Sequence, residues 1–226
     1  MLGVFVNITT VVIGGVIGLF LKQGLNEKVK KVVMQAIGLS TIIIGISSAI
    51  LTESILLLII SLVIGGVIGA LLKIEDNLDK LGMKIEEKFS SEGGFAKGFV
   101  FATLLYCVGA MTIVGSLEAG ITGDNTTLFI KSVLDGTTAI ILTATLGYGV
   151  IFSSFSILII QGGLVLFSGL IEPYLTDAMI TELSAVGGVL ILGIGFNLLE
   201  IKKIYVGDML PAIAVPIVWL LIQGIF

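Results

Sequence analysis

The chain has 226 residues, of which 56% are hydrophobic and only 12% charged, and its formal net charge is −4. A soluble domain carries about 25% charged residues, so this composition excludes an ordinary soluble fold. The chain has no basic patch for a nucleic acid, no pair of cysteines for an internal disulfide and no histidine, the commonest metal ligand. We therefore expect no metal and no cofactor.

Apolar segments of about 20 residues predict an all-α polytopic membrane protein, because that length crosses a hydrocarbon core of roughly 30 Å. The segments are too long and continuous for a β-barrel, whose strands alternate over about ten residues. We predict eight spans, with seven as the alternative count, in a single membrane domain (1–226) that also contacts the lipid bilayer. The spans are 3–22, 32–52, 54–73, 96–114, 128–150, 152–171, 178–200 and 207–226.

Lysine positions predict the orientation. With eight spans, eleven of the twelve lysines fall on one side, and Lys131 is the exception. The positive-inside rule makes that side cytoplasmic and places both termini outside the cytoplasm.

Residues 74–95 form the one long charged connection, and we predict a cytoplasmic amphipathic helix followed by a linker. Its apolar residues recur every three or four positions, as on one helical face. They are Ile74, Leu78, Leu81, Ile85 and Phe89. The helix is expected to lie on the membrane surface or against a partner. A solvated linker helix without a partner is the alternative.

Glycine patterns predict close helix packing and an internal repeat. The segments GGVIGLFLK (14–22) and GGVIGALLK (65–73) share seven of nine positions. A second, shorter match relates a first three-helix unit (1–73) to a last one (151–226) in opposite orientation, around central helices (96–150). Inverted repeats are common in transporters. Small residues let helix backbones approach closely, either within one chain or in a homo-oligomer. The residues predicted to pack helices are Gly14, Gly18, Gly65, Gly69, Gly109, Gly162 and Gly163.

The strongest functional signal lies between residues 106 and 136. Lys131 and Asp135 are four residues apart, so on a helix they share a face and can pair. A charged side chain at membrane depth costs about 3 kcal/mol or more, which predicts a functional site. Two alternatives stay open: residues 115–136 form a re-entrant loop that lines a cavity, or the span starts near Thr137 and the pair lies in an exposed extracellular turn.

Other polar residues are predicted to line the same solute or ion pathway. For the uncharged ones the alternative is a hydrogen bond between helices, worth about 1 kcal/mol or less. With the pair, the predicted pathway contains Glu118, Lys131, Asp135, Thr112, Ser116, Gln161, Asn7 and Thr10.

Several long motifs are similar to a known family. They are CVGAMTIVGSLEAGI (107–121), KSVLDGTTAIILTATLGYGVIFSS (131–154) and AVGGVLILGIGFNLLEIKKIYVGDMLPAI (185–213). With them, nearly the whole chain resembles the uncharacterised bacterial membrane-protein family that includes YdfK and YqgA. The resemblance implies a multi-pass protein of the bacterial inner membrane, sometimes guessed to be a transporter, and it supplies no substrate or catalytic residue.

No enzyme motif is present, so we expect a protein that is not an enzyme. The leading hypothesis is a secondary transporter or channel for a small solute or ion, coupled to a cation or a proton because the acids outnumber the base around Lys131. The alternative is a structural or sensory membrane subunit that docks a cytoplasmic partner through residues 74–89.

Overall fold

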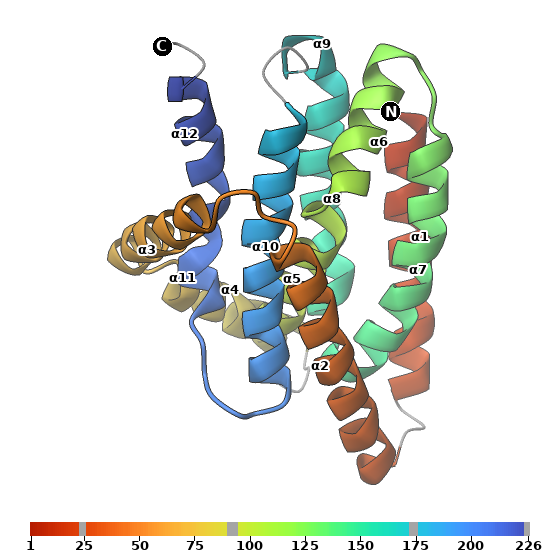
Figure 1. The fold of residues 1–226 in the computed structure, drawn as a ribbon. Coiled ribbons are helices and arrows are strands. Elements are labelled where there is room, and N and C mark those ends of the chain that lie inside the picture. The colour runs from red at the N-terminus through yellow and green to blue at the C-terminus, as the bar shows by residue number, and fades with distance from the viewer. Residues whose placement is uncertain (23–25, 90–94, 172–175, 224–226) are drawn as a thin grey trace. The chain divides into compact units, whose positions relative to one another are not determined.

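The computed structural model describes residues 1–22, 26–89, 95–171 and 176–223, and within them the regular structure is helical (Figure 1). Six helices have the length and composition to cross a membrane, and the count becomes seven if one bent pair is a single span. This confirms the all-helical membrane class but not the count of eight. The six are α1 (Leu2–Lys22), α2 (Glu27–Ala49), α3 (Ile55–Leu72), α7 (Thr126–Leu146), α8 (Gly149–Leu166) and α10 (Asp177–Leu198).

The predicted span 96–114 is the bent pair. It is formed by α5 (Phe95–Cys107) and α6 (Ala110–Ile121), whose axes differ by 57°. Gly109 lies at the break, with φ 158° and ψ 153°, so its backbone is extended between two helices. A side chain added at Gly109 would meet no atom within 4 Å. The residue therefore interrupts a helix and does not form the packing contact that the sequence suggests.

The predicted span 207–226 is also interrupted. It consists of α11 (Val206–Met209), the 3₁₀ turn η2 (Leu210–Ile213) and α12 (Ala214–Gln223). Pro211 sits in the first turn of η2, as expected for a residue that has no N–H to donate. Pro216 occupies the first turn of α12, where the missing N–H is tolerated.

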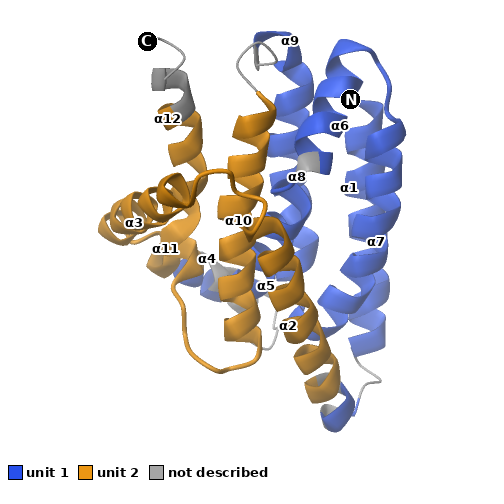
Figure 2. Cartoon of the chain, in the orientation of Figure 1, with its two compact units in different colours: residues 1–30, 79–173 blue, residues 31–78, 174–226 orange. Residues whose placement is uncertain are grey.

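The chain forms two compact units, each built from two separate stretches (Figure 2). Unit 1 contains Met1–Lys30 and Asp79–Pro173, and unit 2 contains Lys31–Leu78 and Tyr174–Phe226. The helix α4 (Ile74–Phe89) begins in unit 2 and ends in unit 1. The short helix α9 (Ser168–Ile171) follows α8 in unit 1.

Within unit 1, α1 and α7 run side by side (Figure 1). Two glycines of α1 make this possible. A Cβ added at Gly14 would collide with the carbonyl oxygen of Gly136, and one added at Gly18 with that of Ile140. Backbone therefore packs directly on backbone, as the GxxxG spacing predicts.

Within unit 2, the second copy of the glycine motif does the same. A Cβ at Gly65 would collide with the backbone of Ala212, and one at Gly69 with the backbone of Asp208. Both copies of GGVIG thus place their first and last glycines against the backbone of another helical segment. The inverted relation between the first and last three-helix units stays a prediction.

The other two glycines expected at helix contacts, Gly162 and Gly163, lie in α8 and are not closely packed. The nearest atom to a Cβ added at Gly162 is 3.7 Å away, an ordinary contact, and nothing lies within 4 Å of one added at Gly163. α8 is held elsewhere, since α5 and α6 both pack on it.

The helix expected at 74–89 is present as α4. Its first turn is fixed within unit 2 by two reciprocal contacts: the Glu75 N–H donates to Asp208 Oδ1 at 2.9 Å, and the Gly207 N–H donates to Glu75 Oε2 at 2.6 Å. Ile74 and Leu78 are half-buried. The side chains of Leu81, Ile85 and Phe89 lie outside the described residues, so the docking of α4 on a membrane or partner stays a prediction.

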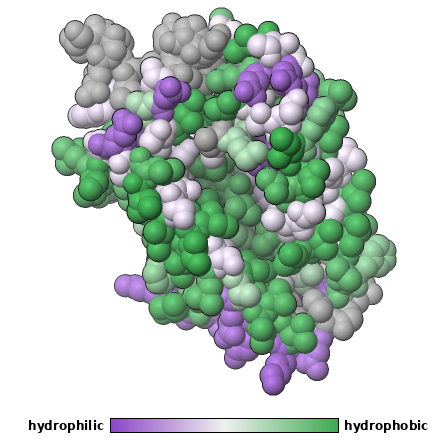
Figure 3. All heavy atoms as spheres, turned by 45° about the vertical axis from the view of Figure 1, so that its right-hand side comes forward, coloured by the Kyte–Doolittle hydropathy of each residue, from purple (hydrophilic) through white to green (hydrophobic). Residues whose placement is uncertain are grey.

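Apolar side chains cover most of the face shown in Figure 3. Many large ones are strongly exposed, for example Phe20 at 72% and Leu71 at 78%. Such exposure is costly in water and favourable in lipid, which supports membrane insertion of these helices.

Candidate functional site

The site is built around an ion pair inside α7. Lys131 Nζ lies 3.0 Å from Asp135 Oδ1 and 2.9 Å from Asp135 Oδ2, and both residues are 6% exposed. α7 begins at Thr126, ten residues before the end of the stretch considered as a loop, so the pair lies within a regular helix. The i,i+4 spacing brings the two charges together one helical turn apart.

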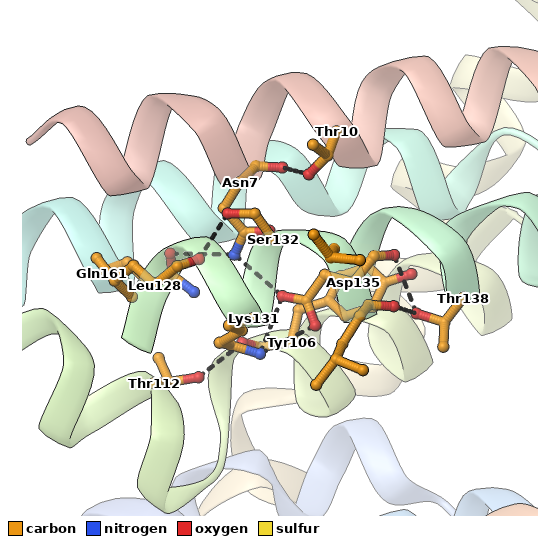
Figure 4. A network of polar contacts seen from close by, with 12 residues as sticks. Asn7, Thr10, Tyr106, Thr112, Leu128, Lys131, Ser132, Asp135, Thr138 and Gln161 are labelled. Carbon is orange, nitrogen blue, oxygen red and sulfur yellow. Dashed lines mark hydrogen bonds and ion pairs between the residues drawn. The ribbon is translucent and has the colours of Figure 1, made fainter. Parts of the chain in front are cut away.

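Two side-chain amides from neighbouring helices join this pair (Figure 4). The Asn7 Nδ2 group of α1 donates to Asp135 Oδ2 at 3.0 Å and to Gln161 Oε1 of α8 at 3.2 Å. Asn7 and Gln161 are fully buried. The four residues form one polar network, which we call the α7 network, and it links α1, α7 and α8.

Asn7 can reach Asp135 because of the glycine contact described above. Gly136 follows Asp135 and lies against Thr10 of α1: a Cβ at Gly136 would come within 2.8 Å of Thr10 Cβ. The close approach of the two backbones brings a short side chain such as asparagine within hydrogen-bonding distance of the carboxylate. The local sequence therefore determines the site. The glycines let α1 and α7 pack closely, and this brings the Asn7 amide within hydrogen-bonding distance of Asp135.

Several buried polar atoms have no hydrogen-bond partner among the described residues. Asn7 Oδ1 and Gln161 Nε2 are buried and unpaired, and so is Ser116 Oγ in α6. An unsatisfied buried polar group costs about 1–3 kcal/mol. Native proteins usually place a water or a ligand at such atoms. The α7 network therefore has one free acceptor and one free donor on adjacent amides.

Unit 2 also contains a buried carboxylate, and its described partners give it a structural role. Glu182 of α10 is 3% exposed, and its oxygens accept from the Thr52 hydroxyl at 2.7 Å and from the N–H groups of Glu53 and Ser54 at 2.8 and 3.1 Å. It closes the turn before α3, where a negative charge at a helix N-terminus is favourable. Glu182 was not among the predicted site residues, and the polar segment TES (52–54) is the part of the sequence that supplies its partners.

Three of the predicted pathway residues bond elsewhere. The Thr10 hydroxyl donates to the Asn7 carbonyl of its own helix at 2.9 Å, and the Thr112 hydroxyl donates to the Tyr106 carbonyl at 2.9 Å, across the break between α5 and α6. Glu118 Oε2 accepts from the Thr127 hydroxyl at 2.7 Å. No described contact joins Glu118 to the network, which therefore holds one acid and one base and has no net charge.

Tyr106 is a residue that the sequence interpretation missed. It is fully buried at the end of α5, and Figure 4 shows it beside Lys131 and Asp135. The sequence feature that could have identified it is a tyrosine, an aromatic residue with a polar hydroxyl, just before the helix break at Gly109. Among the described residues, no group of three or more histidine, cysteine or acidic side chains could hold a metal ion.

Comparison with known proteins identifies the family of the chain. A model of the family "Protein of unknown function (DUF554)" matches residues 2–221. The chain belongs to the DUF554 family. Nearly the whole chain is covered, including all four residues of the α7 network.

Two relatives are similar to the chain over almost its full length. The "Uncharacterized membrane protein YdfK" of Bacillus subtilis (strain 168) is 33% identical over 222 residues, 96% of this chain and 94% of its own. The "Uncharacterized protein YqgA" of Escherichia coli (strain K12) is 32% identical over 218 residues, 94% of this chain and 93% of its own. No solved structure matches. The name of the first relative agrees with the membrane helices of this chain, and the family resemblance of its motifs is confirmed.

Proposed function

We propose that the protein is a transporter or channel for a small solute or ion in the bacterial inner membrane, and that the α7 network is where the solute binds. The observation that carries the proposal is a buried Lys131–Asp135 pair next to two buried amides with an unused acceptor and an unused donor. Charged residues inside membrane helices are costly and usually mark a substrate or ion path. A solute that binds to the unpaired amide atoms would offset part of the cost of burying these charges.

Coupling to a cation or proton would use Asp135, the one acid of the network. A cation would have to displace the Lys131 ammonium, which contacts both carboxylate oxygens. Glu118 does not contribute to this site, because its carboxylate is bonded to Thr127. Coupling would therefore consist of the exchange of the Lys131 ammonium for a cation or proton at the Asp135 carboxylate. The lysine distribution supports cytoplasmic loops after the first, third and seventh predicted spans, with both termini on the opposite side.

The rival explanation of the same network is structural. The contacts of Asn7 with Asp135 and Gln161 tie three helices together, and an interhelical hydrogen bond alone would retain such residues. The two explanations differ in what happens when charge is removed with little change of shape. A structural network predicts a change in stability only, whereas a transport site predicts a change in flux or binding.

The test compares purified wild type with Asp135→Asn in proteoliposomes, over a panel of Na⁺, K⁺, protons, glycine, acetate and acetamide. We expect protein-dependent flux of at least one member, reduced more than tenfold by the substitution. Ser153→Ala is the matched control, because this hydroxyl is buried in α8 and its described hydrogen bond, to Val150 O, stays within its own helix. Identical flux and binding in wild type and Asp135→Asn across the panel would refute the proposal.

A further inference from the structure

We infer that the α7 network takes a small uncharged solute with both a hydrogen-bond donor and an acceptor, of which a primary amide is the simplest example. This inference rests on the proposed function and narrows it to a class of solute. Two observations carry it: the balance of charge in the network and the identity of its unpaired atoms.

The charge balance argues against a bare ion. Lys131 and Asp135 neutralise one another at 2.9–3.0 Å, and Asn7 adds a second donor to the same carboxylate. A cation would have to replace these donors, and an anion would meet the carboxylate beside the lysine. Either ion leaves a buried charge without its partner, which is strongly unfavourable. An uncharged solute can bind without opening the pair.

The unpaired atoms define what such a solute must offer. Asn7 Oδ1 can only accept a hydrogen bond and Gln161 Nε2 can only donate one. Rotating either amide does not pair them with one another. Turning Gln161 would set its NH₂ group against the Asn7 NH₂ group, and turning Asn7 would set its oxygen against the oxygens of Asp135 and Gln161. The Asp135 carboxylate thus fixes the orientation of both amides.

A solute with an N–H and a C=O group offers the donor that Asn7 Oδ1 lacks and the acceptor that Gln161 Nε2 lacks. A site whose buried groups need such partners also rejects analogues that lack them, because binding such an analogue leaves those groups unpaired. The expected selectivity is therefore for amide-like solutes over acetate, glycine and monovalent cations of similar size.

The experiment measures solute entry into proteoliposomes by stopped-flow light scattering. Acetamide is the probe, and acetate, glycine, Na⁺ and K⁺ are the comparison solutes. We expect acetamide to enter wild-type proteoliposomes faster than protein-free liposomes. The protein-dependent rate should fall at least tenfold in Gln161→Met, which keeps the length of the side chain and removes the donor. Ser153→Ala should retain the wild-type rate.

The outcomes separate the inference from the proposed function. Protein-dependent flux of an ion or of glycine, without flux of acetamide, would overturn the inference and leave the transporter proposal standing. Absence of protein-dependent flux for every solute would overturn both. Acetamide flux that Gln161→Met leaves unchanged would also overturn the inference. If Gln161→Met fails to elute as a monodisperse species in detergent, Asn7→Leu removes the free acceptor and is judged by the same criterion.

Discussion

Breaking the ion pair from one side is expected to destabilise the protein strongly. Lys131→Met removes both ammonium contacts to Asp135 and leaves the buried carboxylate with the Asn7 amide as its remaining described donor. Removing one partner of a buried pair costs about 3–5 kcal/mol. We expect a loss of that size in the free energy of unfolding, measured by denaturant titration in mixed micelles with helical circular dichroism as the signal.

The double variant tests whether the loss comes from the unpaired charge. In Lys131→Met with Asp135→Leu the α7 network holds no charge, so the loss in free energy of unfolding should be well below the sum of the two single losses. The coupling energy from the cycle should exceed about 1 kcal/mol, within the range seen for residues in contact. Single losses below about 1 kcal/mol that simply add would refute this reasoning, because they would mean that the pair is solvated.

Three further predictions concern packing, capping and pH. Gly18→Ala should cost about 1–3 kcal/mol, because its Cβ would lie 2.9 Å from Thr143 Cβ and against the Ile140 carbonyl; Gly66→Ala, whose nearest neighbour is 3.9 Å away, should be close to neutral in the same unfolding assay. Glu182→Ala should cost about 2–3 kcal/mol, because two backbone N–H groups and one hydroxyl lose a charged acceptor, whereas the exposed Glu53→Ala should cost little. Hydrogen bonds from Thr126 lower the pKa of the Asp124 carboxyl below its ordinary value. The small stabilisation from the charged carboxylate is therefore present at pH values above the ordinary pKa and is lost as the pH falls through the lowered pKa. An NMR titration that gives Asp124 an ordinary or raised pKa would contradict this.

Sequence reasoning located the polar pair because Lys131 violates an otherwise regular charge distribution. It also placed Asn7 and Gln161 at membrane depth, and the structure brings Asn7 to the Asp135 carboxylate and Gln161 to the Asn7 amide. It paired Lys131 with Asp135 correctly, but it did not show that Glu118 bonds outside the network. Glu118 lies closer in sequence to the apolar span before it, but the break at Gly109 turns α6 by 57°, and Glu118 meets Thr127 instead.

Glycine spacing was informative where both partners are regular helices or turns, and less so elsewhere. The GxxxG pairs of α1 and α3 each pack on backbone, because a ridge without side chains needs only a matching surface. Gly109, in contrast, breaks a helix, and the sequence around it does not distinguish a glycine that interrupts a helix from one that packs against another helix. Hydropathy alone did not give the correct count of spans, because α5–α6 and α11–α12 are mainly apolar in sequence but are interrupted in the structure.

The most direct test of the central claim is whether water-borne reagents reach the α7 network in the membrane. Ser132 is suited to this test, because it is 1% exposed, precedes Asp135 by three residues and Gly136 by four, and so lies on the side of α7 that faces α1. Cys107, the only cysteine, is replaced by alanine, and Ser132→Cys is treated in proteoliposomes with a small charged methanethiosulfonate. A solute site predicts labelling that acetamide slows. Labelling that occurs only after denaturation would show a dry, structural network and would contradict the account.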